Sequence, residues 1–326
     1  MNKYNLSKEY QFDIDVSAYT SYAGKLALPY VTAAVKSPDT IAKGYVRTID
    51  GLNKSARITN LGYSSGPVVA GSDCGFTSSN DTSLTEQVLT LTDLKVNEEI
   101  CRGTVFPTWI GENMDRNGNL PGTFQDFLLA SVAAKAGEQI ENMIWQGASP
   151  FGTGFQSNDG TLDEAGADAS ACKDFFEVDL DGAISTADIL TDLGAVYNSV
   201  VANASGMLSK PGFGFYMNQK TYAIYAQKLA AETTYQQVGA AGTFTGLTYM
   251  GFPIYVCPGM FNDTIIATYP ENLVVGMNAA TDYTEVSIIP TYQFDGSDNI
   301  RIVMNFAMGV QTAVPTDGVF ATSVWT

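Results

Sequence analysis

The most reactive side chains in this chain are its four cysteines, Cys74, Cys101, Cys172 and Cys257. They are far apart in the sequence, without the close pairs that hold zinc or carry out disulfide exchange. The chain has no histidine, which excludes Cys-His and Ser-His catalysis, histidine-based zinc sites and histidine pH switches. The sequence therefore predicts buried or incidental thiols, although a hairpin could bring Cys74 and Cys101 together as a disulfide.

An acidic stretch, Glu177 to Asp188, has the spacing of an EF-hand calcium loop. Its two ends are reversed from the usual pattern, with glutamate first and aspartate last, and Val178 and Leu180 are typical of a strand. Helix capping by Ser185 explains the end of the stretch equally well. Calcium binding is therefore an alternative, and we predict no metal site. Loop positions 1, 3, 5, 6, 8, 9 and 12 are Glu177, Asp179, Asp181, Gly182, Ile184, Ser185 and Asp188.

Two glycine-rich stretches, Gly152–Gly154 and Gly239–Gly246, resemble nucleotide-binding loops only superficially. They lack the glycine spacing and the strand-to-helix setting of a P-loop or a dinucleotide-binding turn. A catalytic pair of carboxylates cannot be selected from 34 acidic residues without a fold. We therefore predict no catalytic residue and no cofactor, and a protein that is not an enzyme.

The charge balance restricts the partners. The 326-residue chain carries 17 basic and 34 acidic residues, a net charge of −17. Such a surface repels phosphate backbones and anionic membranes. No apolar stretch approaches the ~18 residues of a membrane span, and Asn2–Asp15 is too polar for a signal-peptide core. We expect a protein without direct nucleic-acid recognition that folds in a cytoplasm as one large domain or two ordinary ones.

Two long elements stand out in the remaining sequence. In residues 285–312, apolar residues recur at every second position around the turn-rich Asp295–Asn299, which predicts a hairpin with strands of about ten residues, roughly 33 Å each. In Phe124–Gln146, apolar residues recur at three- and four-residue steps before Gly147, which predicts a helix about 34 Å long. We expect the helix to cover the apolar face of the hairpin.

The other segments differ in composition. Residues 37–105 are strand-like, lack apolar residues for a core of their own, and should project onto another subunit. Residues 151–182 are rich in glycine, alanine and aspartate, which indicates a surface loop. Residues 183–280 alternate helix and strand, with one helix capped by Ser185 or Thr186. Further predicted elements are strands at Lys43–Ile49, Ala56–Leu61, Glu86–Val96, Phe213–Met217, Pro253–Val256, Thr264–Thr268 and Asn272–Val275, and a helix at Gln219–Ala231.

The order of these parts resembles the HK97-like major capsid proteins of tailed bacteriophages. These have an extended N-terminal arm, a long β-loop, a long helix, a compact α/β region and a closing long hairpin. Short motifs agree over essentially the whole chain, each weak alone but consistent in order and spacing. They are Pro121–Phe124 and Ile144–Gly147 at the ends of the long helix, Phe215–Tyr222, Gly251–Ile254 with Pro258–Met260, and Asn272–Gly276.

The resemblance implies an α+β fold in which a compact α/β A-domain joins a P-domain made of a spine helix and a long β-hairpin. It implies a structural protein that self-assembles into an icosahedral shell of hexamers and pentamers enclosing double-stranded DNA, without sequence-specific contact. The implied parts are an N-arm at 1–36, an extended E-loop at 37–105, the P-domain with its spine helix at 106–150, an acidic loop or insertion at 151–182, the A-domain at 183–280, the P-domain hairpin at 281–312 and a C-terminal return to the A-domain at 313–326.

The resemblance also implies partners and a location. We expect a homo-oligomer that works with portal, scaffolding or decoration proteins, and that is found in the virion after synthesis in a host cytoplasm. Some relatives join subunits by a Lys–Asn isopeptide bond. Lys43, Lys54 and Lys95 lie in the implied E-loop, but no motif selects one of them, and we predict no crosslink. Because arm-like sequence follows Met1 directly, scaffolding should be a separate protein or absent.

Two other functions fit parts of the sequence. An encapsulin-type cargo shell has the same architecture and differs in its contents, which are an enzyme rather than a genome. A calcium-dependent surface or adhesion protein would use the 177–188 stretch, and its melting temperature would depend on calcium.

Overall fold

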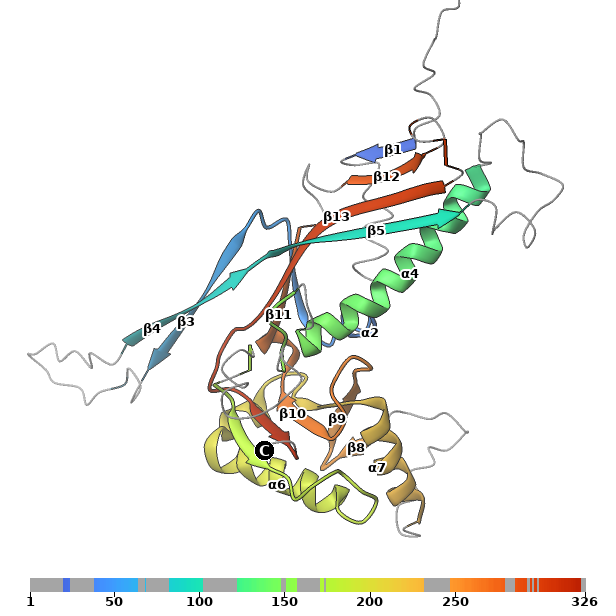
Figure 1. Ribbon diagram of the computed structural model, residues 1–326. Helices are drawn as coiled ribbons and strands as arrows, with labels where there is room; N and C mark the ends of the chain where they lie inside the picture. Colours follow the sequence, from blue (N-terminus) through green and yellow to red (C-terminus); the bar gives the residue numbers. More distant parts are fainter. Residues whose placement is uncertain are drawn as a thin grey trace, which may run out of the picture.

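The protein is elongated, with a compact module at one end and a long sheet backed by one helix at the other (Figure 1). A two-stranded ribbon projects sideways from the region where the two parts meet. The computed structural model describes residues 20–23, 38–63, 68, 82–101, 122–147, 151–156, 171–172, 174–231, 247–278, 285–291, 294, 296–297 and 299–323.

Strand β13 (Asn299–Thr312) organises the long sheet, because it changes partners along its 14 residues. Its first part pairs antiparallel with β12 (Glu285–Pro290) on one side and with β5 (Thr92–Cys101) on the other. Its last part pairs with β11 (Leu273–Met277). Two short strands extend the sheet, β1 (Thr20–Ala23) beside β12 and β2 (Arg47–Asp50) parallel to β11.

The predicted hairpin exists, but its two strands are unequal. Strand β12 has 6 residues and β13 has 14, instead of about ten each. The reason is the partner change: from Met308 onward β13 pairs with β11, so β12 has nothing to pair with beyond Asn305. The alternating apolar pattern of β13 continues because the same face stays buried along its whole length.

Helix α4 (Gly122–Gln146) packs along the apolar face of this sheet, which confirms the predicted helix and its position. It ends at Gly147, whose φ of +65° is the left-handed conformation that glycine adopts most readily. The shared core contains helix residues Leu129, Val132, Ile140 and Ile144 and strand residues Ile300, Ile302, Met304 and Phe306.

The compact module is a second layer with its own core. Its six-stranded sheet has the order β6-β14-β10-β7-β9-β8, and helix α6 (Ile189–Asn203) buries Ile189, Leu193, Val196 and Val200 in that core. The strands are β6 (Phe176–Asp179), β7 (Gly214–Met217), β8 (Thr248–Tyr249), β9 (Phe252–Val256), β10 (Thr264–Thr268) and β14 (Val319–Thr322), and the other helices are α7 (Gln219–Ala231) and the 3-10 helices η3 (Ser205–Ser209) and η4 (Pro270–Asn272).

A buried asparagine connects the two sheets where β10 leads into β11. Asn272 donates hydrogen bonds to the hydroxyl of Thr268 (3.1 Å) and the carbonyl of Asp317 (2.7 Å). Its side-chain oxygen accepts one from the backbone N–H of Val314 (2.7 Å). All its polar atoms have partners, as a buried amide requires, so this residue holds the β13–β14 connection against the start of β11.

Four local predictions need correction. Helix α6 begins at Ile189, because residues 185–188 form a turn in which Asp188 N–H donates to the Ser185 carbonyl (3.2 Å). The Lys43–Ile49 strand shortens to β2, since a short helix α2 (Asp39–Ala42) and Gly44 at φ +70° precede it. The Glu86–Val96 strand is two strands, β4 (Thr82–Thr90) and β5, separated at Leu91.

The fourth correction concerns residues 151–182, which are not a surface loop at their ends. Phe155 and Phe175 are buried in the core, and β6 pairs parallel with β14. Gln156 is also buried, and its amide donates to the Thr264 hydroxyl (2.8 Å). The composition wrongly indicated a surface loop, because glycine and aspartate outnumber the few aromatic residues that anchor both ends in the core. Residues 157–170 lie outside the described part of the chain.

Candidate assembly interface

The projecting ribbon consists of β3 (Ser55–Tyr63) and β4, paired antiparallel in one continuous register. Leu61 lies directly opposite Leu84, and these side chains are 51% and 68% exposed. Val88, on the same face, is 49% exposed. Because an isolated two-stranded ribbon is marginally stable in water, this apolar face indicates a surface that is covered by another molecule.

The base of the ribbon lies on a pair of glycines, which we call the glycine saddle. Gly276 of β11 and Gly309 of β13 are partners in register. The end of β4 crosses them so closely that a Cβ atom on Gly309 would overlap the Thr90 carbonyl, and one on Gly276 would meet the side chain of Leu89. Leu89 is fully buried there. Because neither glycine has a side chain, β4 can cross β11 and β13 at this short distance. This close crossing sets the direction in which the ribbon leaves the long sheet.

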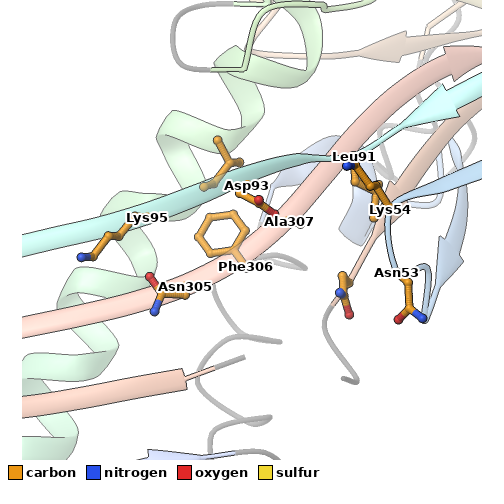
Figure 2. A pocket seen from close by; sticks show the side chains of 10 residues that line it. Asn53, Lys54, Leu91, Asp93, Lys95, Asn305, Phe306 and Ala307 are labelled. Atoms are coloured by element: carbon orange, nitrogen blue, oxygen red, sulfur yellow. The ribbon is translucent and has the colours of Figure 1, made fainter. Parts of the chain in front are cut away.

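A groove of about 680 Å³ opens beside the ribbon base. Figure 2 shows Lys95 and Asn305 at one end, Lys54 and Asn53 at the other, and Phe306 between them. Lys95 and Asn305 are register partners of β5 and β13. The backbone N–H of Leu91 donates to the Lys54 carbonyl (2.8 Å), which fixes the second end. We call this the base groove; its remaining lining residues are Leu91, Asp93, Leu94, Asn278 and Ala307.

The sequence interpretation placed residues 37–105 in one projecting loop, and the structure divides them. Strand β5 pairs with β13 over its whole length, and β2 pairs with β11, so both belong to the long sheet. Among the described residues of this range, only β3 and β4 leave the long sheet as a ribbon. The sequence could not show this division, because β5 has an irregular burial pattern with few fully buried residues.

A buried carboxylate joins α2, α4 and the loop after β9. Glu141 of α4 is 5% exposed and accepts hydrogen bonds from the backbone N–H of Thr40 (3.1 Å) and from the Thr40 hydroxyl. That hydroxyl in turn accepts the indole N–H of Trp145 (2.8 Å). Burial raises the pKa of the Glu141 carboxyl, while hydrogen bonds from Thr40 and the Gly259 backbone oppose the rise. We call this set of contacts the Glu141 joint.

Sequence reasoning did not identify Glu141, although a signal was present. Gly137, Glu141 and Trp145 follow one another at four-residue steps and all three are buried, so α4 has a second buried stripe beside its apolar one. Because residues four apart lie on one face of a helix, Glu141 lies on the face of Trp145, a large residue that is often buried. The glutamate has a structural role here, since its partners are donors of neighbouring elements.

The cysteines do not form a reactive site in the described part of the chain. Burial raises the pKa of Cys172 and of Cys257 well above the ordinary thiol value, which disfavours the nucleophilic thiolate. Cys101 is an exposed free thiol at the end of β5. Cys74 lies outside the described residues, and the alternative of a bridge between it and Cys101 finds no support, because Cys101 is a free cysteine.

The calcium-loop interpretation does not fit the geometry of residues 177–188. Glu177 and Asp179 lie in β6, which pairs with β14, rather than in a loop that could wrap around an ion. The Ser185 hydroxyl donates to Asp188 (2.6 Å), which makes the end of the stretch a turn before α6. No three acidic or thiol side chains gather closely enough to hold a metal within the described ranges.

This acidic turn nevertheless affects a neighbouring carboxyl. Asp192, in the first turn of α6, is 9% exposed. Burial raises its pKa to about 6, and the charges of Asp188 and Asp181 add to the rise. Since this pKa exceeds the ordinary aspartate value, the folded state binds a proton more readily than the unfolded state does. The contribution of Asp192 to the free energy of unfolding therefore falls as pH rises from about 4 to about 6.

We expect Asp192→Asn to stabilise the unassembled subunit at pH 7.5 by about 1–2 kcal/mol, because it removes the buried charge. At pH 4 the aspartate is already neutral in the folded state, so the two proteins should unfold alike. Urea unfolding at both pH values measures the difference, and Asp174→Asn, at an exposed position, is the control. Parallel stability curves for wild type and Asp192→Asn across this pH range would contradict the prediction.

The three lysines considered for a crosslink lie in different settings. Lys43 forms an ion pair with Asp39 (2.9 Å) one turn earlier in the chain, while Lys54 and Lys95 line the base groove. The absence of an isopeptide crosslink stays a prediction. Among the described residues, no helix combines the length and the apolar character that crossing a membrane requires.

Comparisons identify the architecture. No family model and no curated protein matches the sequence. A chain of Gordonia phage Cozz matches with a TM-score of 0.54 and 14% identity, covering 87% of this chain and 86% of that one. A chain from the satellite phage P4 procapsid, solved with a size determination protein, matches with a TM-score of 0.52 and 10% identity over 92% and 98%. A virus-like particle from Pyrococcus furiosus matches with a TM-score of 0.50 and 11% identity over 91% and 98%.

The chain therefore has the HK97-like fold of phage capsid proteins, of the α+β class, as the sequence resemblance implied. The matched proteins whose descriptions name an assembly are structural components of capsids, procapsids or particles rather than enzymes. The fold extends over nearly the whole chain, so the long sheet, helix α4 and the compact module belong to one architecture.

Proposed function

We propose that this protein is the major capsid protein of a tailed bacteriophage, which self-assembles into an icosahedral shell of hexamers and pentamers around double-stranded DNA. The observation that carries the proposal is an HK97-like fold whose projecting ribbon exposes a paired apolar face. A neighbouring subunit would cover that face. The other partners would be a portal and scaffolding or decoration proteins, and the location would be the virion.

The shape and charge of the subunit support this function. A thin sheet with one helix leaves apolar surface that only neighbours can bury, and many weak contacts made together give a stable shell. The net charge of −17 disfavours tight binding to the phosphate backbone of DNA. DNA would then be enclosed without being held, so that it can leave the particle.

We divide the subunit along the lines that the resemblance implied. The A-domain would be residues 183–280 together with the 313–326 return, and the P-domain would be 106–150 with 281–312. Residues 1–36 would form the N-arm, and 151–182 the acidic connection. Within the implied E-loop, 37–105, β3 and β4 are the part that would reach a neighbour.

Negative-stain electron microscopy of the purified full chain tests the proposal. We expect closed particles of uniform size, in equilibrium with hexamers, pentamers or free subunits. A compact monomer that melts cooperatively and forms no particle at any concentration would contradict it. Scaffolding protein from the same genome can be added if closed particles need it, and the absence of particles under both conditions would then be decisive.

An encapsulin-type cargo shell is the second candidate, and the similarity to the Pyrococcus furiosus virus-like particle supports it. Chains of Gordonia phage Cozz, Microbacterium phage Oxtober96, satellite phage P4 and Myoviridae phage XM1 match with TM-scores of 0.51 to 0.54, which favours the phage capsid. The contents of particles from the natural source distinguish the two. Nuclease-protected genomic DNA identifies a capsid, and a single co-purifying enzyme identifies a cargo shell.

A further inference from the structure

We infer that residues 38–46 form a strap on helix α4 that opens at its Thr40 end, and that the Glu141 joint is the latch of this strap. Thr40 stays bound while the Glu141 carboxyl is neutral and is released when the carboxyl ionises. The strap would thus be a proton-controlled clamp on the end of α4. The inference concerns the single subunit, so it goes beyond the proposed shell function and does not depend on it.

The strap lies between two strands at opposite edges of the long sheet. Strand β1 is the edge strand beside β12, and β2 is the other edge strand, beside β11. The chain between β1 and β2 has to pass from one edge to the other, and α2 contacts α4 on the way (Figure 1). A segment in this position ties the last turns of α4 to both edges of the sheet.

Helix α2 is too short to hold itself in place. It has four residues, and Pro38 before it provides no side-chain cap, so its stability depends on packing against other elements. Its ion pair between Lys43 and Asp39 is exposed and contributes little. The backbone N–H groups of residues 42–45 donate to carbonyls of residues 38–41. These hydrogen bonds therefore persist only while the strap is docked.

Polar contacts hold the strap at both ends. At the first end, Thr40 is fully buried, and its N–H and its hydroxyl both donate to Glu141. At the second end, the Tyr216 hydroxyl donates to the Tyr45 carbonyl (2.8 Å), and the ring centroids of Tyr45 and Tyr255 are 4.8 Å apart. Burial raises the pKa of these three tyrosines, so the second end does not titrate near neutral pH. The Thr40 end is the one that responds to pH.

The loop after β9, which also bonds to Glu141, has attachments that do not depend on the carboxyl. Gln146 Nε2 donates to the Gly259 carbonyl (2.8 Å), and the Phe261 N–H donates to the Gln156 side chain (2.8 Å). A Cβ atom on Gly259 would overlap the backbone carbonyl of Glu141, so this loop lies directly on α4. A change of charge on Glu141 should therefore move the strap rather than the loop.

The groups around Glu141 provide no compensating charge. Asp39 and Lys43 approach it from α2, but they pair with each other (2.9 Å). Cys257, directly after β9, is a neutral thiol, because burial and the charge of Glu141 raise its pKa. Within the described residues, no lysine or arginine forms an ion pair with Glu141. The ionised carboxyl would therefore gain from contact with water.

This environment sets the direction of the pH effect. Burial raises the pKa of the Glu141 carboxyl, the hydrogen bonds from Thr40 oppose the rise, and the charge of Asp39 adds to it. Opening the strap would bring water to the carboxyl and return its pKa toward the ordinary value. Protonation therefore favours the closed strap and ionisation the open one. The open population should grow as pH rises through the raised pKa.

Hydrogen exchange of the unassembled, full-length subunit tests the latch. Protection factors of the amides of residues 42–45, corrected for the intrinsic exchange rate at each pH, measure the open population of the strap. We expect them to fall at least tenfold between pH 5 and pH 8. The amides of Phe261 and of β10 should change less than threefold, because their partners do not include Glu141.

Three variants separate the latch from other effects. Glu141→Gln keeps an acceptor for Thr40 and cannot ionise, so the protection of residues 42–45 should stay constant within threefold over this pH range. Asp192→Asn is the matched control, because it removes another buried carboxyl with a raised pKa; the tenfold fall should remain. Tyr216→Phe frees the second end and should lower protection at every pH without changing its pH dependence.

Two results would overturn the inference. The first is strap protection that is constant from pH 5 to pH 8 in the wild type, or that falls equally in Glu141→Gln. The second is an equal fall at Phe261 and in β10, which would show unfolding of the whole subunit instead of the strap. This second comparison needs only the wild-type protein, so it decides the matter even when Glu141→Gln fails to fold. Particle formation tests the shell function separately.

Discussion

Gly309→Ala should lower the stability of the subunit and prevent shell formation. The added methyl group would overlap the Thr90 carbonyl, which is backbone and cannot rotate away as a side chain can. Adding one methyl group to a well-packed contact costs about 1–3 kcal/mol. The strands would have to separate at the saddle, which changes the direction of the ribbon. We therefore expect a lower melting temperature and a larger loss of assembly than the stability loss alone would cause.

Circular dichroism melting of unassembled protein and light scattering during assembly give the two quantities. Gly206→Ala is the control, because no atom lies within 4 Å of a Cβ at that position; its effect should stay within about 0.5 kcal/mol. Gly276→Ala should be milder than Gly309→Ala, since the atom in its way belongs to the flexible Leu89 side chain. A Gly309→Ala protein that melts and assembles like wild type would show that the saddle does not position the ribbon.

Glu141→Ala should destabilise the subunit by about 3 kcal/mol or more. The change leaves the N–H and hydroxyl of Thr40 and the backbone N–H of Gly259 facing a cavity without an acceptor. Unsatisfied buried donors cost about 1–3 kcal/mol each, and structural relaxation recovers part of the total. Since these donors come from α2 and from the loop after β9, losing the acceptor loosens both elements from α4.

Urea unfolding measures this effect, with Glu138→Ala as the control on the same helix. Glu138 is exposed and pairs only with Lys135 among the interactions of the described residues (2.5 Å), so its loss should cost under about 1 kcal/mol. Glu141→Gln keeps the shape and one acceptor and should lie between the two. Equal stability of Glu141→Ala and Glu138→Ala would rule out a structural role for the joint.

The pH dependence provides a second test of the Glu141 joint. Burial raises the pKa of Glu141 above its ordinary value, so the folded state holds this proton to a higher pH than the unfolded state does. The contribution of Glu141 to stability is therefore greatest below the ordinary pKa and declines as pH rises through the raised one. Glu141→Gln should remove this decline, which unfolding curves between pH 4 and pH 8 would show.

Periodicity in the sequence was sufficient for the long elements. The two-residue period of Ile300–Val310 and the three-to-four-residue period of Phe124–Ile144 each continue over many residues, so β13 and α4 were placed correctly and their contact followed from their matching lengths. Helix α7 and strand β10 were predicted with their observed bounds. The fold class came from the resemblance to HK97-like capsid proteins that the order of these elements carries.

The interface depends on features that periodicity does not contain. Gly276 and Gly309 matter because they are partners in space, and no sequence pattern marks two glycines 33 positions apart as one contact. The change of partner along β13, from β12 to β11, likewise depends on how the strands meet in the sheet and not on a pattern within one strand. The base groove is lined by Asn53 and Lys54, which precede β3, and by residues of β5 and β13. Lys54 and Lys95 could therefore be named from the sequence, but their proximity could not be predicted.

Strand β14 (Val319–Thr322) lies between β6 and β10, inside the sheet of the compact module. A ribosome that has translated everything through β13 has therefore produced a module with a gap in its sheet, although domains generally fold as units during synthesis. The module can close only after residue 322 has left the exit tunnel. A chain that ends before β14 therefore lacks the strand that joins β6 to β10, so the sheet of the compact module depends on the last described strand of the chain.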